Sequence, residues 1–184
     1  MLSARRLFTA ALVAGGALVA TSLPAVATTA TATLTGGTLG FVAAPAATGF
    51  SVSLTGQDVT SNSTQTFDVG DATGSGSGWN ITATSTSFTA GSHSLATRSV
   101  TVQAVPTAAC DAGASCTTAT NAVSYPYTLP AGTTAPTATK LFNSAANTGL
   151  GNQTVTLVFK LAIPANAFAG SYSSTWTYTL VSGP

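Results

Sequence analysis

Charged side chains are scarce in this sequence of 184 residues. It contains no glutamate, four aspartates, two lysines, three arginines and one histidine, and its formal net charge is +1. Helical bundles and coiled coils draw heavily on glutamate, lysine and arginine, so the composition argues against both. A nucleic-acid-binding face needs clustered basic residues, and two of the five, Arg5 and Arg6, occur at the extreme N-terminus. We therefore expect no nucleic-acid partner.

Hydroxyl side chains are abundant instead, with 35 threonines and 20 serines. Threonine, valine, phenylalanine and tyrosine favour strands, whereas glycine and proline favour turns. Alternation of apolar and polar residues, typical of half-buried strands, occurs in residues 50–54, 79–84, 100–104, 155–163 and 172–180. A short strand is expected at residues 67–69 and a single helical turn at residues 165–169. The sequence predicts an all-β fold: an antiparallel β-sandwich, immunoglobulin-like or related, with about 8–10 strands and little helix.

Residues 1–27 have the pattern of a secretory signal peptide. Arg5 and Arg6 precede an uncharged apolar run, residues 7–23, and Ala25 and Ala27 supply the small residues that a signal peptidase reads. The run is short and rich in glycine and alanine, which argues against a retained membrane anchor. We expect export by the general or the twin-arginine route. The secreted mature chain, residues 28–184, is expected to form a single domain without a membrane span.

The two cysteines, Cys110 and Cys116, are separated by five residues. In an exported chain such a pair favours a structural disulfide. Because the loop is short, the stabilisation should be at the low end of about 2–4 kcal/mol. A metal pair is the weaker alternative, because two thiolates need further ligands and His93 is the only histidine. A redox pair is weaker too, because the spacing is not Cys-x-x-Cys.

Residue patterns typical of catalytic sites are missing. His93 has no Gly-x-Ser-x-Gly motif to accompany it, and the glycine-rich residues 74–78 lack the lysine of a phosphate-binding loop. Asp68 and Asp71 precede that glycine-rich stretch, so we expect them to accept backbone N–H bonds and fix the loop. A weak calcium site and a catalytic carboxylate pair are the less favoured alternatives. We expect no enzyme activity, no cofactor and no metal.

Two tryptophan motifs carry a family resemblance. The proximal one is Trp79-Asn80-Ile81, and the distal one is Tyr172-Ser173-Ser174-Thr175-Trp176-Thr177-Tyr178-Thr179-Leu180-Val181-Ser182-Gly183-Pro184. With the opening residues 34–39 and the acidic, glycine-rich residues 71–78, they make the chain resemble the WxL-domain family of Gram-positive bacterial surface proteins. Three positions depart from the family pattern. Ile81 replaces leucine, Trp176 occurs where leucine is usual, and Tyr178 occurs where tryptophan is usual.

The resemblance implies a secreted, extracellular β-sandwich that associates non-covalently with the cell wall, through peptidoglycan. The alternative is a structural or adhesive subunit that binds another surface protein rather than glycan.

The motif side chains have two interpretations. They are Trp79, Ile81, Tyr172, Trp176, Tyr178 and Leu180. We favour a place in the core, because aromatic side chains bury large areas in sandwich interiors. The alternative is an exposed aromatic surface that stacks on sugar rings or packs on a partner protein. A mixed arrangement, in which the motifs build the scaffold and nearby loops bind, is also open.

Overall fold

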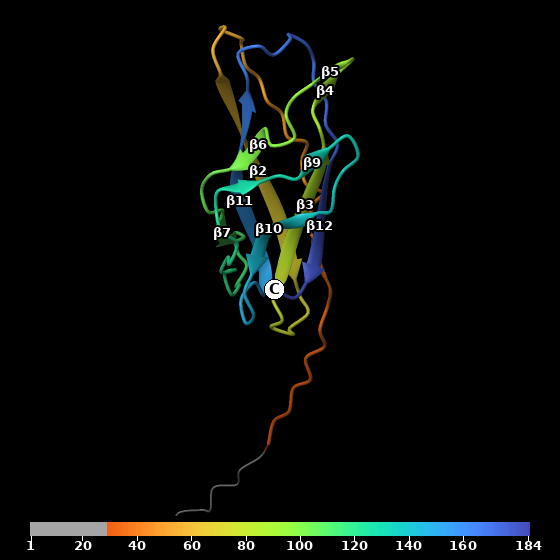
Figure 1. Ribbon diagram of the computed structural model, residues 1–184. Coiled ribbons are helices and arrows are strands. Elements are labelled where there is room, and N and C mark those ends of the chain that lie inside the picture. The colour runs from red at the N-terminus through yellow and green to blue at the C-terminus, as the bar shows by residue number, and fades with distance from the viewer. Residues whose placement is uncertain (1–28) are drawn as a thin grey trace, which may run out of the picture. The chain divides into compact units, whose positions relative to one another are not determined.

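Strands β2 (Val59–Asp71) and β11 (Gly151–Ile163) form the longest strand pair in the computed structural model, which describes residues 29–184 (Figure 1). They pair antiparallel over all thirteen residues of each strand. The other edge of β11 pairs with β7 (Thr107–Cys110) and, further along, with β6 (Val100–Val102). Strand β1 (Leu39–Phe41) pairs with β2, and β8 (Tyr127–Thr128) pairs with β6. These six strands form the first sheet.

The second sheet is built on β3 (Trp79–Thr86), which pairs antiparallel with β10 (Thr139–Ser144) and with β12 (Trp176–Ser182). Strand β9 (Ala131–Gly132) pairs parallel with the last residues of β3. A small separate hairpin consists of β4 (Thr89–Ala90) and β5 (His93–Ser94).

Apolar side chains from both sheets fill the space between them. Every second residue of β11 from Gln153 to Ile163 is buried, as is every second residue of β2 from Gln65 to Asp71. The largest side chains of the core are Phe67, Trp79, Phe142 and Phe159, each at most 1 % exposed. The predicted all-β sandwich is therefore confirmed. It contains twelve strand segments, eight of them three residues or longer, and residues 29–184 contain no helix.

The sandwich has two ends that differ in what they carry. The first end contains the glycine-rich loop, residues 72–78. The first and last parts of the sandwich chain both bond to this loop: Gly37 N donates to Ala72 O, and Gly183 N donates to Gly78 O. At the opposite end β2 begins, β11 ends and β12 begins. We call this second end the tip; it consists of residues 43–58, residues 164–175 and the β4–β5 hairpin (Figure 1).

Two local predictions were wrong. Residues 50–54 alternate apolar and polar side chains but form no strand. Val42 N makes the last backbone bond from this segment to β2, donating to Asp68 O. Further along, the contacts with β2 are made by side chains: Thr48 Oγ1 donates to Gln65 Oε1, and Ser61 Oγ donates to Ser51 O. Residues 165–169 form a turn, in which Ala167 N donates to Pro164 O, rather than a helical turn.

The predicted disulfide is confirmed. It joins Cys110, the last residue of β7, to Cys116, with 5.5 Å between the two Cα atoms. The adjacent Gly151 at the start of β11 has a positive φ, and a Cβ there would come within 3.0 Å of Cys116 Cβ. The small loop is therefore packed against the main strand ladder.

Residues 35–184 form one compact unit, and the preceding residues belong to another. Of that other unit, the structure describes residues 29–34, which are exposed and form no strand. The predicted signal peptide, residues 1–27, lies outside the described residues. The described part of the chain includes no helix of the length and apolarity that a membrane crossing requires.

Trp79 anchors the glycine-rich end of the core. Its side chain is completely buried, its Nε1 donates to Gly149 O at 2.9 Å, and its ring stacks on Phe142 with 5.4 Å between centroids. Gly149 has φ of 85°, and a Cβ there would lie 2.5 Å from Trp79 Nε1. Only glycine fits both the backbone conformation and the indole at this position.

We predict that Trp79→Ala lowers the free energy of unfolding by about 3–5 kcal/mol, because it leaves a large cavity and an unpaired Gly149 carbonyl. Urea unfolding of residues 28–184 measures the change. Val181→Ala, at a side chain that is 43 % exposed on β12, is the control and should change stability by less than about 1 kcal/mol. Equal effects of the two substitutions would contradict this anchoring role.

Candidate functional site

The two motifs occupy different depths of the fold. Trp79 and Ile81 lie on β3 and are completely buried, so neither can contact a ligand. Trp176, Tyr178 and Leu180 lie on β12, are partly buried, and pack against the core from the edge of the second sheet. Tyr172 precedes β12, is also partly buried, and its hydroxyl donates to Phe168 O. The proximal motif is therefore part of the scaffold, whereas the distal motif reaches the surface.

Trp176 is the centre of an aromatic cluster that joins the two sheets. Its ring lies 4.8 Å from that of Phe159 on β11, and 6.2 Å from each of Phe50 and Phe88. Beside it, Tyr178 lies 4.8 Å from Phe67 on β2. Most of these pairs meet edge to face, the arrangement that aromatic quadrupoles favour. The cluster holds the tip segments against the sandwich.

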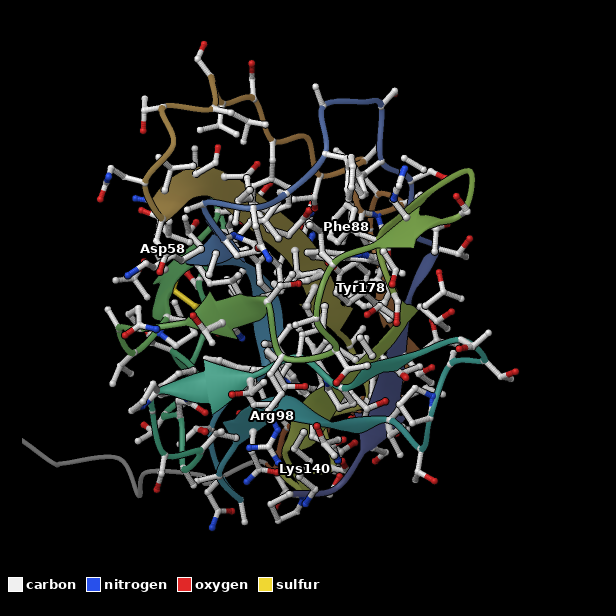
Figure 2. The ribbon with its side chains drawn as sticks, turned by 45° about the horizontal axis from the view of Figure 1, so that its top comes forward. Asp58, Phe88, Arg98, Lys140 and Tyr178 are labelled. Atoms are coloured by element: carbon white, nitrogen blue, oxygen red, sulfur yellow. A yellow bond between two sulfur atoms is a disulfide. The ribbon has the colours of Figure 1, made fainter. Side chains whose placement is uncertain are left out.

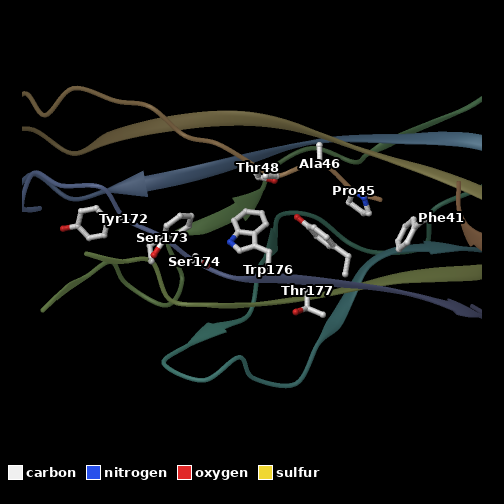
Figure 3. A pocket seen from close by; sticks show the side chains of 12 residues that line it. Phe41, Pro45, Ala46, Thr48, Tyr172, Ser173, Ser174, Trp176 and Thr177 are labelled. Atoms are coloured by element: carbon white, nitrogen blue, oxygen red, sulfur yellow. The ribbon is translucent and has the colours of Figure 1, made fainter. Parts of the chain in front are cut away.

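A groove of about 610 Å³ runs along this cluster; we call it the aromatic groove. Residues 45–48 line one side, and residues from 172–178 line the other, with Phe41 and Phe88 completing the wall. Figure 3 shows Pro45, Ala46 and Thr48 on one chain segment and Trp176 and Thr177 on β12. The groove therefore borders the outer edge of β12.

A second hollow of about 650 Å³ opens at the tip; we call it the tip hollow. It is lined by residues from 48–54, 161–163 and 167–172, together with Phe88 and Leu95. Its rim exposes apolar side chains: Phe168 is 62 % exposed, Leu54 41 % and Val52 40 %. Exposed apolar groups gathered in one place usually mark a binding surface.

Both hollows are lined by hydroxyl groups and by no charged side chain. Thr48, Ser51 and Ser171 lie in the wall of the tip hollow, and no aspartate, lysine, arginine or histidine lines it or the aromatic groove. The basic side chains Arg98 and Lys140 lie apart from Phe88 and Tyr178 (Figure 2). His93 lies next to the rim, where its ring stacks on that of Phe168 with 3.9 Å between centroids. These surfaces suit an uncharged ligand with both apolar faces and hydroxyls.

The two aspartates that were expected to fix the loop differ in position. Asp71 is buried, and its Oδ1 accepts bonds from Thr73 N at 3.0 Å and Thr73 Oγ1 at 2.6 Å, so it does fix the start of the loop. Asp68 lies within β2, accepts no bond from the loop, and has Asp111 as a neighbour. Within residues 29–184, no three His, Cys, Asp or Glu side chains gather as a metal site would require.

Sequence reasoning missed the loop aromatics Phe50, Phe88 and Phe168. Phe50 belongs to residues 50–54, for which the alternation predicts a strand, and the other two lie in segments with no periodicity. The available signal was an isolated aromatic residue among small polar neighbours, which is unusual for a surface loop unless it packs or binds.

The buried hydroxyl of Tyr178 generates a stability prediction. It lies near Thr48 but makes no hydrogen bond of acceptable geometry among the described residues, and burial raises the pKa of Tyr178 well above its usual value. By contrast, the hydroxyl of Tyr125 donates to Leu141 O at 2.6 Å and accepts from Asn121 Nδ2 at 3.1 Å. An unpaired buried hydroxyl is destabilising, whereas a paired one contributes about 1 kcal/mol.

We therefore expect Tyr178→Phe to leave the free energy of unfolding unchanged or raise it by about 1 kcal/mol, and Tyr125→Phe to lower it by about 1 kcal/mol. Chemical denaturation of the two variants side by side measures both. A loss at Tyr178 as large as that at Tyr125 would mean that the Tyr178 hydroxyl has a partner.

The position of Asp68 leads to a prediction of how stability depends on pH. Burial, followed by the charge of the neighbouring Asp111, raises the pKa of Asp68 above 3.8. A raised pKa in the folded state means that the contribution of Asp68 to stability is fully present below its unfolded pKa and is lost as pH rises through the folded pKa. Asp68→Asn should thus raise the melting temperature at pH 7, and the gain should vanish below about pH 4.

Asp58→Asn is the matched control for Asp68→Asn, since Asp58 Oδ1 accepts a bond from Ala165 N at 2.8 Å. This control should not raise the melting temperature. A gain in Asp68→Asn that persists at low pH would show that it does not come from the carboxylate charge.

Models of protein families, curated proteins and solved structures give no match to this chain. The function therefore has to be inferred from the chemistry of the site. That chemistry consists of exposed apolar rings, hydroxyls and no charge, gathered at the tip on a disulfide-bonded all-β scaffold.

Proposed function

We propose that this chain is a secreted surface protein that associates non-covalently with the bacterial cell wall, and that the tip hollow binds the glycan of peptidoglycan. The observation that carries the proposal is the lining of the tip hollow, which combines exposed Phe168 with hydroxyls and has no charged residue. A pyranose ring has an apolar C–H face and a polar rim, and these match an aromatic ring with hydroxyls around it.

Three further features support this function. The disulfide is compatible with an oxidising, extracellular setting. The two tryptophan motifs, Trp79-Asn80-Ile81 and the segment from Tyr172 to Pro184, resemble those of wall-associated WxL domains. The tip is formed by loops on a rigid sandwich, which is the usual place for binding residues. In this arrangement Trp79 and Trp176 support the scaffold, and the loop aromatics make the contacts.

A protein partner is the second candidate. Val52, Leu54 and Phe168 are apolar and exposed at the rim, and such a rim also fits a structural or adhesive subunit that binds another surface protein. Glycan binding is favoured by the hydroxyls and by the hollowed form of the site, because ligand sites for small molecules are concave.

Sedimentation with isolated peptidoglycan tests the proposal. Residues 28–184 should pellet with the sacculi, and Phe168→Ala should weaken binding about tenfold, which corresponds to about 1.4 kcal/mol for a lost ring contact. Val158→Ala, at a side chain 46 % exposed on the outer face of β11, is the matched control and should bind normally. Circular dichroism checks that each variant is folded.

Folded protein that stays in the supernatant would refute glycan binding and favour a protein partner. Equal weakening by Phe168→Ala and Val158→Ala would place the contact elsewhere than the tip hollow.

A further inference from the structure

The outer edge of β12 is an unpaired sheet edge. Thr86 N donates to Thr175 O, and Gly183 N donates to Gly78 O, so residues 175 and 183 face β3. In an antiparallel pair, bonding residues alternate with residues whose N–H and C=O groups point away. The backbone groups of Trp176, Tyr178 and Leu180 therefore point away from β3, and no backbone partner for them exists among the described residues.

Strand β12 itself carries none of the sequence features that normally protect edge strands, although Phe41 and residues 45–48 line the groove beside it. Such edges are usually blocked by lysine, proline, a bulge or a covering segment. Strand β12 contains no charged residue, proline or glycine over its seven residues, and its register with β3 has no irregularity. The side chains of Thr177, Thr179 and Val181 are exposed, whereas those of Trp176, Tyr178 and Leu180 are half-buried.

The aromatic groove borders the first residues of this edge. The aromatic groove, with its volume of about 610 Å³, separates residues 172–178 from residues 45–48 (Figure 3). A strand added here must be uncharged, like the lining of the groove. It must also place apolar side chains toward Trp176 and Tyr178 and polar side chains outward, continuing the alternation of β12.

Residues 29–35 of this chain meet these requirements. Their sequence is Thr-Ala-Thr-Ala-Thr-Leu-Thr, in which Ala30, Ala32 and Leu34 alternate with four threonines, and it contains no charge. Small alanines suit the part of the groove next to bulky rings. Leu34 is 90 % exposed, the most exposed large apolar side chain of the described residues. Seven extended residues span about 23 Å, which is the length of a seven-residue strand such as β12.

We propose that residues 29–35 of one copy add as a strand to the outer edge of β12 in a second copy, so that the secreted protein assembles head to tail. Main-chain hydrogen bonds to Trp176, Tyr178 and Leu180 supply the affinity, and Leu34 in the aromatic groove supplies the specificity. The contact joins two different surfaces, so a pair of copies keeps one free edge and one free segment. Such heterologous contacts form rings or open filaments rather than closed dimers.

The assembly state of residues 28–184 tests this proposal. We expect analytical ultracentrifugation to show oligomers that grow with concentration, and residues 36–184, which retain β1–β12, to stay monomeric. Leu34→Lys should weaken assembly at least tenfold, because it places a charge against the groove. Thr33→Lys is the matched control, because its side chain faces solvent in the added strand and assembly should persist.

Amide hydrogen exchange identifies the edge. A peptide of residues 28–36, added to residues 36–184, should protect the amides of Trp176, Tyr178 and Leu180, while those of Thr177 and Thr179 are already protected by β3. The same peptide with Leu34→Lys should not. Monomers at every concentration would overturn the proposal. So would concentration-independent protection of these amides in a monomer, because the segment would then pair within its own chain.

The two proposals can fail separately. Leu34→Lys should still pellet with peptidoglycan, and Phe168→Ala should still assemble. Loss of both properties in either variant would show that a single surface is involved, and would overturn the strand-addition proposal.

Discussion

The antiparallel pairing of β2 with β11 is the interaction on which the rest of the structure depends. Its continuous thirteen-residue register turns Phe67 and Val69 to the same side as Val155, Leu157 and Phe159. A slip of one residue would expose this whole apolar set, so the register is fixed by burial as much as by hydrogen bonds. The second sheet packs onto this face, and Trp79 and Trp176 occupy opposite ends of the contact. In a chain with 5 % charged residues, burial and backbone bonding carry the stability that ion pairs cannot.

Those parts of the fold in which side-chain periodicity coincides with burial could be predicted from the sequence. Residues 155–163 and 79–84 alternate clearly, and both lie in central strands. The first half of β2 could not be found, because Thr60, Asn62 and Thr64 alternate with the equally polar Ser61 and Ser63. Its strand conformation comes from pairing with β11. Residues 50–54 show the converse, since they have the pattern of a strand but contact β2 through a side-chain bond, from Ser61 Oγ to Ser51 O, rather than a backbone ladder.

The candidate site was less accessible to prediction than the fold. Trp79 and Trp176 both lie in segments with the same apolar–polar alternation. Trp79 nevertheless lies on the central strand β3, whereas Trp176 lies on the edge strand β12. Their difference in exposure follows from strand order, which no local pattern contains. Phe88 and Phe168 meet at the tip although 80 positions separate them in the chain. Only the assembled sandwich brings their loops together, which is why the tip hollow could not be anticipated residue by residue.

Scarcity of charge also determines what kind of contact this protein can make. The expected mature chain, residues 28–184, has three basic residues and four aspartates, so its formal charge is +3 − 4 = −1. Anionic wall polymers would gain nothing from such a surface, and long-range steering is absent. The proposed recognition therefore rests on short-range contacts, which would be stacking on Phe168, hydroxyl hydrogen bonds and the main-chain groups of β12. Such contacts are screened little by salt. Each such contact is weak, so the proposed association with a polymeric wall would gain from many linked copies, because each bound copy would raise the effective concentration of the next. Glycan binding at the tip and strand addition at β12 would in this way reinforce one another, although Thr48, Phe88 and Tyr172 line both hollows.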